Sequence, residues 1–288
     1  MAGNLPLGAF EVAAPPGSAH AQQKAWPPRS ELAPAPPVLV AGVCGGAGVT
    51  TTVLGLASRL ACASPALHTV AVDAVAGDLV SRGADARLLP ATVQAWLADS
   101  DSPAALRLVE TVSLASSGAG LLRCEPGPLP RRATLSTLCD RLIAERAVPV
   151  VDGGGSVSAM SLRPLLARPD LRIVVVIPAR PDAATRTQVA LQWLDAHLGG
   201  DLIAEATLVV SHQMPRTVAI AHQLRSQYTG WVARVLEVPF DPHLAKGTAI
   251  TDAALSAYTR AAYTEIAQQL WPEHPLGMRS VAEVGDAR

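Results

Sequence analysis

An apolar run that leads directly into a glycine-rich turn limits most strongly how this chain folds. Residues 38–43 are apolar or glycine, and the next eight residues read Cys44-Gly45-Gly46-Ala47-Gly48-Val49-Thr50-Thr51. A glycine-rich turn between a buried strand and a helix lets successive main-chain N–H groups surround an anion, and the helix N-terminus adds its dipole. The pattern therefore predicts a strand, a phosphate-binding loop and a helix from Thr50 to Cys62.

The loop lacks the charged side chains that usually hold a nucleotide. In the common pattern a lysine follows the last glycine and reaches the outer phosphates, and the next Ser or Thr places its hydroxyl on magnesium. Here Thr50 fills the hydroxyl position, whereas Val49 stands in the lysine position. The glycines also have an explanation without phosphate, because a turn with positive φ or close helix packing requires them too.

In this loop the chain resembles the MinD/ParA family of dimeric P-loop ATPases. The family loop reads lysine-glycine-glycine-x-glycine-lysine-threonine-threonine, so Cys44 replaces the first lysine and Val49 replaces the second. The resemblance implies that the first lysine reaches the nucleotide of the partner subunit. With Cys44 in that position, we expect an oligomeric state that does not respond to ATP.

Two later motifs extend the resemblance, and each ends a valine-rich strand. Asp73 matches the first aspartate of a family pair, and Val75 stands where the second, linked to activation of the attacking water, belongs. Asp152 matches the magnesium-side aspartate, so the resemblance implies a weak magnesium site at Thr50 and Asp152. The cofactor-binding residues that it implies are Gly45, Gly46, Ala47, Gly48, Val49, Thr50, Thr51, Asp73 and Asp152.

The three departures, at Cys44, Val49 and Val75, concern the same chemistry. Hydrogen bonds to charged groups contribute about 1.5–3 kcal/mol each, so the loss of two lysines removes roughly 3–6 kcal/mol of phosphate binding or transition-state stabilisation. This corresponds to a factor on the order of a hundred to ten thousand. Since phosphoryl transfer depends on positioning and charge neutralisation, we expect negligible ATP hydrolysis. The expected cofactor is either none or weakly bound ATP or ADP with magnesium.

Apolar runs that alternate with helical patterns predict an α/β fold, with a mostly parallel sheet covered by helices on both faces in a P-loop NTPase-like three-layer sandwich. The helix that begins at Asp182 is expected to bury Val189, Trp193 and Leu194. Strands are expected at His68–Asp73, Leu121–Arg123, Val148–Asp152, Leu171–Ile177, Ala206–Ser211 and Val232–Val238, and further helices at Thr92–Ala98, Ala133–Arg146, Val218–Tyr228 and Asp252–Leu270.

The sequence divides into three parts. Residues 1–37 are rich in Pro and Ala and are expected to form a disordered tail. Residues 38–271 are expected to form the MinD/ParA-like P-loop domain, and residues 272–288 a flexible C-terminal tail. Within the domain, Val238-Pro239-Phe240-Asp241 resembles the family segment that borders the adenine base.

Charge and composition restrict the partners. A net charge of -1 gives no global electrostatic reason for binding nucleic acid or acidic membrane. Four cysteines without paired spacing and without a secretory signal indicate a cytoplasmic protein, and residues 272–288 lack the amphipathic pattern of a membrane anchor. DNA binding is a minority hypothesis, because the arginines that would support it form no dense cluster: Arg180, Arg186, Arg216, Arg225 and Arg234.

Three functional hypotheses follow. The first is a catalytically degenerate MinD/ParA-like protein that acts as a binding or positioning module in a bacterial assembly, such as septum placement, DNA partition, a pilus or a secretion apparatus. The second is an ATP-dependent dimeric switch in which arginines replace the missing lysines, because Arg is a capable phosphate ligand. The third is a heterodimer in which an intact relative supplies catalysis. The partners expected are thus a second copy, an intact relative or another protein of a larger assembly.

Overall fold

A computed structural model describes residues 35–64, 68–83, 89, 92–98, 112–130, 133–215 and 220–272. Most of the two predicted tails, 1–37 and 272–288, and the first residues of the helix expected at Val218 lie outside this part of the chain. At the ends of the described domain, Ala35 is buried, and the indole Nε1 of Trp271 donates a hydrogen bond of 3.2 Å to the carbonyl oxygen of Pro36.

Eight strands of the described chain form one sheet in the order β3-β4-β2-β5-β1-β6-β7-β8. The β3–β4 pair is antiparallel, and the other neighbouring pairs are parallel. The sheet therefore confirms the expected α/β fold. The strands are β1 (Val38–Gly42), β2 (His68–Asp73), β3 (Ser113–Leu114), β4 (Gly120–Leu122), β5 (Ala147–Asp152), β6 (Arg172–Pro178), β7 (Thr207–Ser211) and β8 (Arg234–Val238).

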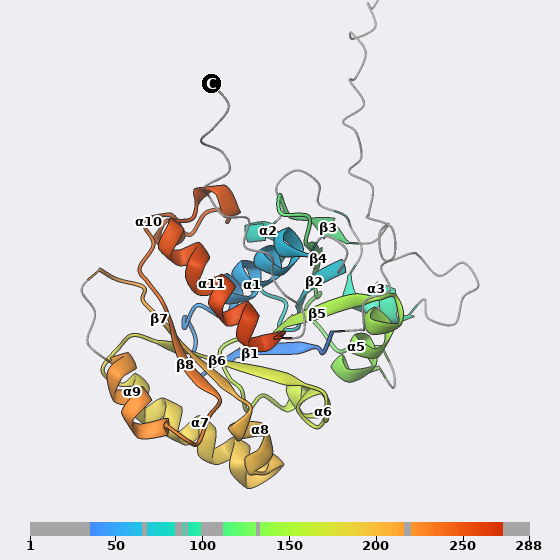
Figure 1. Ribbon diagram of the computed structural model, residues 1–288. Coiled ribbons are helices and arrows are strands. Elements are labelled where there is room, and N and C mark those ends of the chain that lie inside the picture. Colours follow the sequence, from blue (N-terminus) through green and yellow to red (C-terminus); the bar gives the residue numbers. More distant parts are fainter. Residues whose placement is uncertain are drawn as a thin grey trace, which may run out of the picture.

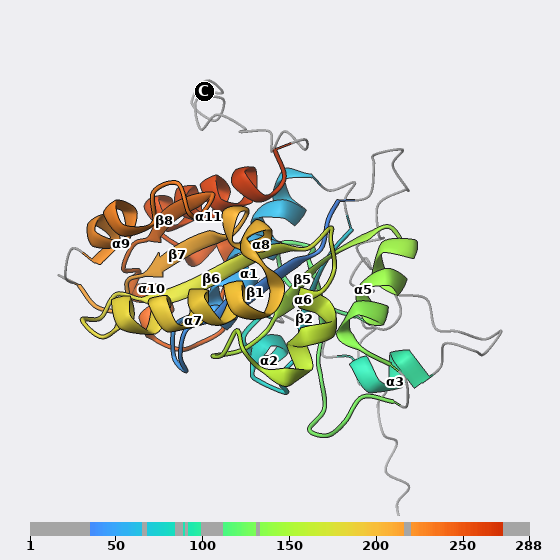
Figure 2. The same ribbon diagram turned by 90° about the horizontal axis from the view of Figure 1, so that it is seen from below.

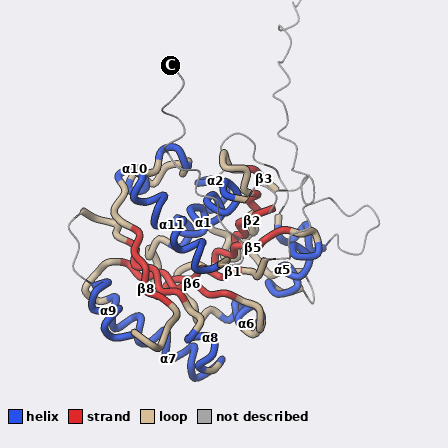
Figure 3. The backbone as a smooth tube through the Cα atoms, in the orientation of Figure 1, coloured by secondary structure: helices blue, strands red, loops and turns tan. Residues whose placement is uncertain are grey.

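Helices cover both faces of this sheet, as Figures 1 and 2 show, and the strands form the middle layer in Figure 3. One face carries α1 (Val49–Ala63), α2 (Leu79–Gly83) and α11 (Ala257–Leu270). The other face carries α3 (Val93–Ala98), α5 (Leu135–Ala144), α6 (Arg163–Leu166), α7 (Ala183–Leu198), α8 (Gly200–Ala204) and α9 (Ile220–Tyr228). Shorter elements are η2 (Met160–Leu162), α10 (Pro242–Ala245) and η3 (Asp252–Ala254).

Strand β6 shows why its sequence is apolar from Ile173 to its end. Ile173, Val175 and Ile177 pack into the core on the α7 face, while Val174 and Val176 pack into the core beneath α1 and α11. Because successive side chains of a strand point to opposite faces, a strand covered on both faces needs an apolar residue at every position. The apolar composition of the central strands thus indicates a sheet that is covered on both faces.

Two details of the expected helices are wrong. Val189 was expected on the buried side of α7, yet 60% of it is exposed. The buried side instead includes Thr187. Its hydroxyl donates a hydrogen bond of 2.7 Å to the Ala183 carbonyl oxygen, so this polar group can lie in the core. Because Thr187 is polar, the sequence pattern did not show which side of α7 is buried.

The second error concerns the long helix expected from Asp252 to Leu270. It is interrupted after η3, because Leu255 adopts an extended backbone conformation and Ser256 becomes the N-cap of α11. The Ser256 hydroxyl accepts a hydrogen bond of 3.1 Å from the Thr259 N–H. Serine favours this position over a helix interior because its side chain replaces the missing main-chain acceptor.

The topology places the carboxyl end of β1 at the centre of the sheet. β1 lies between β5 and β6, whereas the chain after β1 passes over β5 to form β2. In open α/β sheets, the carboxyl ends of the strands at such a change of direction form a crevice that binds ligands. The glycine-rich loop between β1 and α1 lies at this edge.

Candidate functional site

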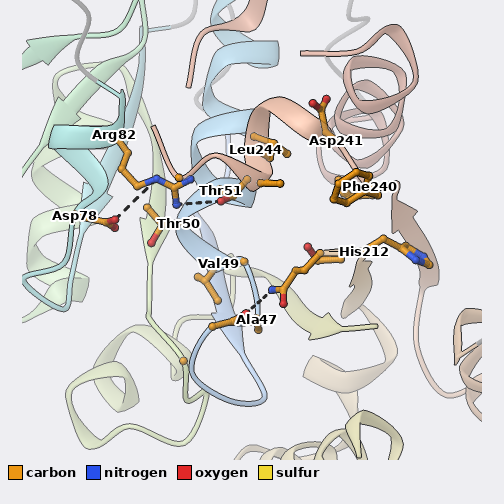
Figure 4. A pocket seen from close by; sticks show the side chains of 18 of the residues that line it. Ala47, Val49, Thr50, Thr51, Asp78, Arg82, His212, Phe240, Asp241 and Leu244 are labelled. Carbon is orange, nitrogen blue, oxygen red and sulfur yellow. Dashed lines mark hydrogen bonds and ion pairs between the residues drawn. The ribbon is translucent and has the colours of Figure 1, made fainter. Parts of the chain in front are cut away.

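A pocket of about 490 Å³ lies at the carboxyl ends of β1, β7 and β8 (Figure 4). One wall is the loop between β1 and α1, and the opposite wall is the segment between β8 and α10. Six of the nine residues expected to bind a cofactor line it: Gly46, Ala47, Gly48, Val49, Thr50 and Thr51. The remaining three, Gly45, Asp73 and Asp152, are not among the lining residues.

The loop has the backbone geometry of an anion cradle. Gly46 and Gly48 have φ values of 70° and 95°, and a Cβ atom on Gly48 would lie 2.9 Å from the Ser211 hydroxyl oxygen. Gly48 is also the N-cap of α1, and within the described part of the chain no side chain caps this end of the helix. The first N–H groups of a helix lack intrahelical partners, so they are suited to an anion in the pocket.

Behind the loop, Thr50 and two aspartates form a polar cluster. The Thr50 hydroxyl donates a hydrogen bond of 2.7 Å to Asp152 Oδ2. Asp73 and Asp152 are paired in register on β2 and β5, and each is only 1% exposed. The N–H groups of Val75 and Gly154 each donate at 2.9 Å, to Asp73 and Asp152 respectively.

Burial dominates the electrostatics of both carboxyl groups. It raises the pKa of Asp152 to about 6, although the Thr50 hydroxyl and the Gly154 N–H act in the opposite direction. Burial likewise raises the pKa of Asp73, against the lowering effect of neighbouring N–H groups. Both shifts have the same cause, because desolvation disfavours a charged carboxylate that has no cation beside it.

Thr50 and Asp152 fit the magnesium that the fold family implies. In the described residues no Arg or Lys forms an ion pair with Asp73 or Asp152, so two buried carboxylates lie together without compensating charge. A hard divalent cation prefers such oxygen donors. Within the same part of the chain there is no cluster of three or more His, Cys, Asp or Glu residues with the arrangement of a metal site. Magnesium would therefore need phosphate and water oxygens as its remaining ligands.

Val49 and Val75 occupy the positions where charges are missing, and Val49 is buried whereas Val75 is 45% exposed. Val49 is only 6% exposed and belongs to the core beneath α1, and a Cβ atom on Gly42 would lie 3.0 Å from its Cγ2. Val75 packs over Gly154, where an added Cβ would lie 2.9 Å from its Cγ1. Neither valine side chain can neutralise a phosphate or orient an attacking water molecule.

Two arginines that were not expected at the loop lie beside it. The Arg82 Nη1 donates a hydrogen bond of 3.2 Å to the Thr51 hydroxyl, and Figure 4 shows its guanidinium next to Thr50 and Thr51. The Arg180 Nη2 lies 3.1 Å from the Cys44 sulfur, beside the position of the family's first lysine. Arg82 and Arg180 are far from the loop in the sequence, so only the strand order could have revealed their placement.

The opposite end of the pocket is more apolar. Val238, Pro239, Phe240 and Leu244 line it, which places the segment that resembles an adenine border at the pocket wall. Asp241 fixes this wall by accepting hydrogen bonds of 2.9 Å from the N–H groups of His243 and Ser256. Although burial opposes ionisation, these N–H donors and nearby hydroxyls hold the pKa of Asp241 below its usual value.

The arginines considered for DNA binding are largely paired with carboxylates. Arg180 and Arg186 lie 3.5 and 2.7 Å from Asp182, and Arg225 lies 2.6 Å from Glu237. Arg234 is exposed on β8, and Arg216 lies outside the described residues. No helix of the described chain combines the length and apolar character needed to cross a membrane.

Comparisons with known proteins find similarity at the level of structure. No protein-family model matches the sequence, and no curated protein does so. A ParA family ATPase from Chlorobium tepidum superposes with a TM-score of 0.63 at 17% identity, covering 82% of this chain and 98% of that one. MinD in the MinC:MinD cell division complex of Aquifex aeolicus gives 0.60 at 13% identity, with 82% and 96% covered.

A third similar structure is the cobyrinic acid a,c-diamide synthase of Mycobacterium smegmatis, which contains a bound ATP analogue and magnesium. Its TM-score is 0.53 at 17% identity, with 81% of this chain and 93% of that chain covered. These identities are too low to carry over an activity, since one fold hosts many functions. The agreement over four-fifths of the sequence and the loop at β1 shows that the chain has the fold of the ParA and MinD ATPases.

Proposed function

We propose that this chain is a non-hydrolysing relative of the ParA and MinD ATPases, which acts in the bacterial cytoplasm as a binding or positioning module of a larger assembly. Septum placement, DNA partition, a pilus and a secretion apparatus are the settings that this fold suggests. The proposal rests above all on Val49, because the position of the phosphate-binding lysine is filled by a side chain buried in the core.

The surrounding residues support the same conclusion. Val75 replaces the carboxylate linked to water activation and is packed over Gly154. In contrast, Thr50 and Asp152, the two residues to which the resemblance assigns magnesium, are joined by a hydrogen bond. The site thus retains groups that bind and lacks groups that accelerate phosphoryl transfer, which depends on charge neutralisation at the transferred phosphate.

A phosphate-release assay with ATP and magnesium tests the proposal. We expect no release above the buffer rate at any protein concentration. The Asp152→Ala variant is the matched control, because it removes the magnesium-side carboxylate and leaves the loop sequence intact. Phosphate release that is proportional to the native protein and absent in Asp152→Ala would show true catalysis and refute the proposal.

An ATP-dependent dimeric switch, with weak or partner-assisted hydrolysis, is the second candidate. The observation in its favour is the position of Arg82 and Arg180, which bring cations to the two sides of the loop. Arg binds phosphate well, so these residues could act for the missing lysines. Light scattering with and without ATP distinguishes the candidates, since a switch requires the molar mass to change.

The partner in the proposal is supported by exposed apolar side chains in segments that follow strands of the sheet. Val75, Met160, Val189 and Met214 are 45, 68, 60 and 67% exposed, and along the chain they come after β2, β5, β6 and β7 respectively. Exposed apolar side chains of this kind can contribute to a protein contact. We propose a second P-loop subunit as the occupant, either a copy of this chain or an intact relative that supplies catalysis.

Co-purification of the full-length chain from its native host tests this partner. Recovery of a second P-loop protein, lost when Met214 is changed to Asp, supports a heterodimer. A self-association that the same substitution abolishes supports a homodimer. Trp231→Asp is the control, because Trp231 is equally exposed at 67% but lies shortly before the first residue of β8, at the opposite edge of the sheet. If Met214→Asp and Trp231→Asp behave alike, this surface is not the contact.

A further inference from the structure

We infer that Arg82 is the phosphate-binding cation of this pocket, and that the ligand is a nucleoside di- or triphosphate that is bound but not hydrolysed. The inference deepens the proposed function, since it names the ligand class and the binding residue of the same pocket. It depends on the geometry of α2, an element outside the loop motif.

The position of Arg82 is set from both ends of its side chain. Its main-chain N–H donates to the Asp78 carbonyl at 2.9 Å, and its carbonyl accepts from the Ile250 N–H at 2.7 Å. The guanidinium Nη1 is held by the Thr51 hydroxyl at 3.2 Å. Arg82 is thereby oriented toward the first turn of α1, as Figure 4 shows.

The charge and the hydrogen-bond donors of Arg82 are only partly compensated within the protein. Its side chain is 18% exposed, and the contact of its Nε with Asp78 is long, at 3.9 Å. Nε is buried and has no hydrogen-bond partner in the described structure. An unsatisfied buried donor costs about 1–3 kcal/mol, so the guanidinium of Arg82 is not fully satisfied within the protein.

Arg82 is also the only Arg or Lys among the described residues that line the pocket. The same wall contains the hydroxyls of Thr50 and Thr51 and the N-terminus of α1. Together these groups make one end of the pocket suited to a polyanion, because guanidinium groups bind phosphate oxygens in a bidentate manner.

The lining at the other end of the pocket indicates which chemical group of the ligand carries the phosphate. Val238, Pro239, Phe240 and Leu244 give the pocket apolar lining, and Figure 4 shows Phe240 on the side of the pocket away from Arg82. A flat, weakly polar ring such as a nucleobase matches this lining, whereas inorganic phosphate or pyrophosphate leaves it unused. The volume of about 490 Å³ lies within the range of small-molecule sites.

Calorimetric titration of the full chain with ADP, ATP, pyrophosphate and adenosine, each with magnesium, tests the assignment. We expect ADP and ATP to bind more tightly than pyrophosphate or adenosine. Arg82→Ala should weaken ADP binding by about tenfold to hundredfold, in line with the loss of a charged hydrogen bond. Arg82→Lys should keep part of the affinity, because it keeps the charge but loses the planar fork.

Two further variants separate binding from folding. Thr51→Val keeps the side-chain shape but removes the hydroxyl that orients Arg82, so it should also weaken ADP binding. Arg186→Ala removes an arginine on α7 outside this pocket, and it should bind ADP as the native chain does. Thermal unfolding of each variant shows whether a lost affinity reflects a lost fold.

The outcomes distinguish this inference from the proposed function. Equal ADP affinity in the native chain and in folded Arg82→Ala overturns the assignment of Arg82, as does a native chain that binds neither ADP nor ATP. Tighter binding of pyrophosphate than of ADP overturns the nucleotide as the ligand. Catalytic phosphate release refutes the non-hydrolysing function instead, and it leaves the role of Arg82 to be decided by the affinities.

Discussion

At the scale of single residues, the loop edge depends on the close approach of two glycines. A Cβ atom on Gly155 would lie 2.7 Å from Gly45 Cα and 2.8 Å from its N, whereas a Cβ on Gly45 would meet nothing within 4 Å. We expect Gly155→Ala to lower the free energy of unfolding by about 1–3 kcal/mol through overpacking. Gly45→Ala should change it by less than about 0.5 kcal/mol. Urea unfolding measures both, and equal effects would contradict this contact.

Asp241 gives the expected dependence of stability on pH. Its pKa is lowered in the folded chain, so its stabilising effect is complete above the unfolded value of about 3.9 and is lost as the pH falls through the folded value. We expect Asp241→Asn to lower the free energy of unfolding by about 1.5–3 kcal/mol at neutral pH. The difference between the two proteins should shrink below about pH 4. Chemical unfolding at several pH values tests this, and a constant difference would contradict it.

The residues of the candidate site differ in how far the sequence could predict them. Thr50 and Asp152 each belong to a local motif at the end of a strand, and the structure joins them at 2.7 Å. Arg82 belongs to no motif, and its contact with Thr51 depends on where α2 lies against α1. A local sequence pattern can identify a functional group at the end of a strand. A contact between two helices cannot be predicted in this way, because it depends on how the helices pack in the folded chain.

At the scale of elements, the contact between α1 and α11 depends on a glycine. A Cβ on Gly55 would overlap the ring of Tyr263, which is fully buried. We expect Gly55→Ala to destabilise the native chain by about 1–3 kcal/mol, even though Ala is the better helix former by about 1 kcal/mol. In a Tyr263→Leu background the same change should be neutral or stabilising, because the ring is gone. A double-mutant cycle by urea unfolding measures this coupling, and additive effects would exclude the contact.

The element boundaries show which local signals were sufficient. β2 runs from His68 to Asp73 as the valine pattern predicted, because Val70, Ala71 and Val72 are buried in a strand covered on both faces. The last helix was predicted as one segment, since apolar spacing continues through Leu255. The Ser256 N-cap and the hydrogen bond of 2.9 Å from the Ser256 N–H to Asp241 both mark the break, and the second contact joins residues too far apart to form a local pattern.

At the scale of the whole molecule, the sequence predicted the layers better than the edge of the sheet. Consecutive apolar strands separated by helices require a parallel sheet with two covered faces, and the central strands show this. The antiparallel pair of β3 and β4 was not predicted, since β3 comprises only Ser113 and Leu114. Two residues are too few for a recognisable alternation.

Association of the whole molecule should not depend on ATP. The resemblance to the MinD/ParA family implies that a lysine at the first position of the loop connects one subunit to the nucleotide of the other, and here that position is Cys44, next to Arg180. Arg180 is itself 3.5 Å from Asp182, so its charge is already partly compensated within its own subunit. A ligand stabilises a dimer only through a difference in its affinity for the two states. Without a cation that crosses the interface, bound ATP contributes little to that difference.

Light scattering of the full chain at several concentrations, with and without ATP and magnesium, measures this expectation. The molar mass should be the same under both conditions, whether the chain is monomeric or dimeric. The matched variant is Cys44→Lys, which restores the family residue; any response to ATP should be larger in this variant than in the native chain. A native chain that dimerises only when ATP is added would instead mean that Arg180 or Arg82 crosses to the second subunit, and the ATP-dependent switch would then replace the proposed function.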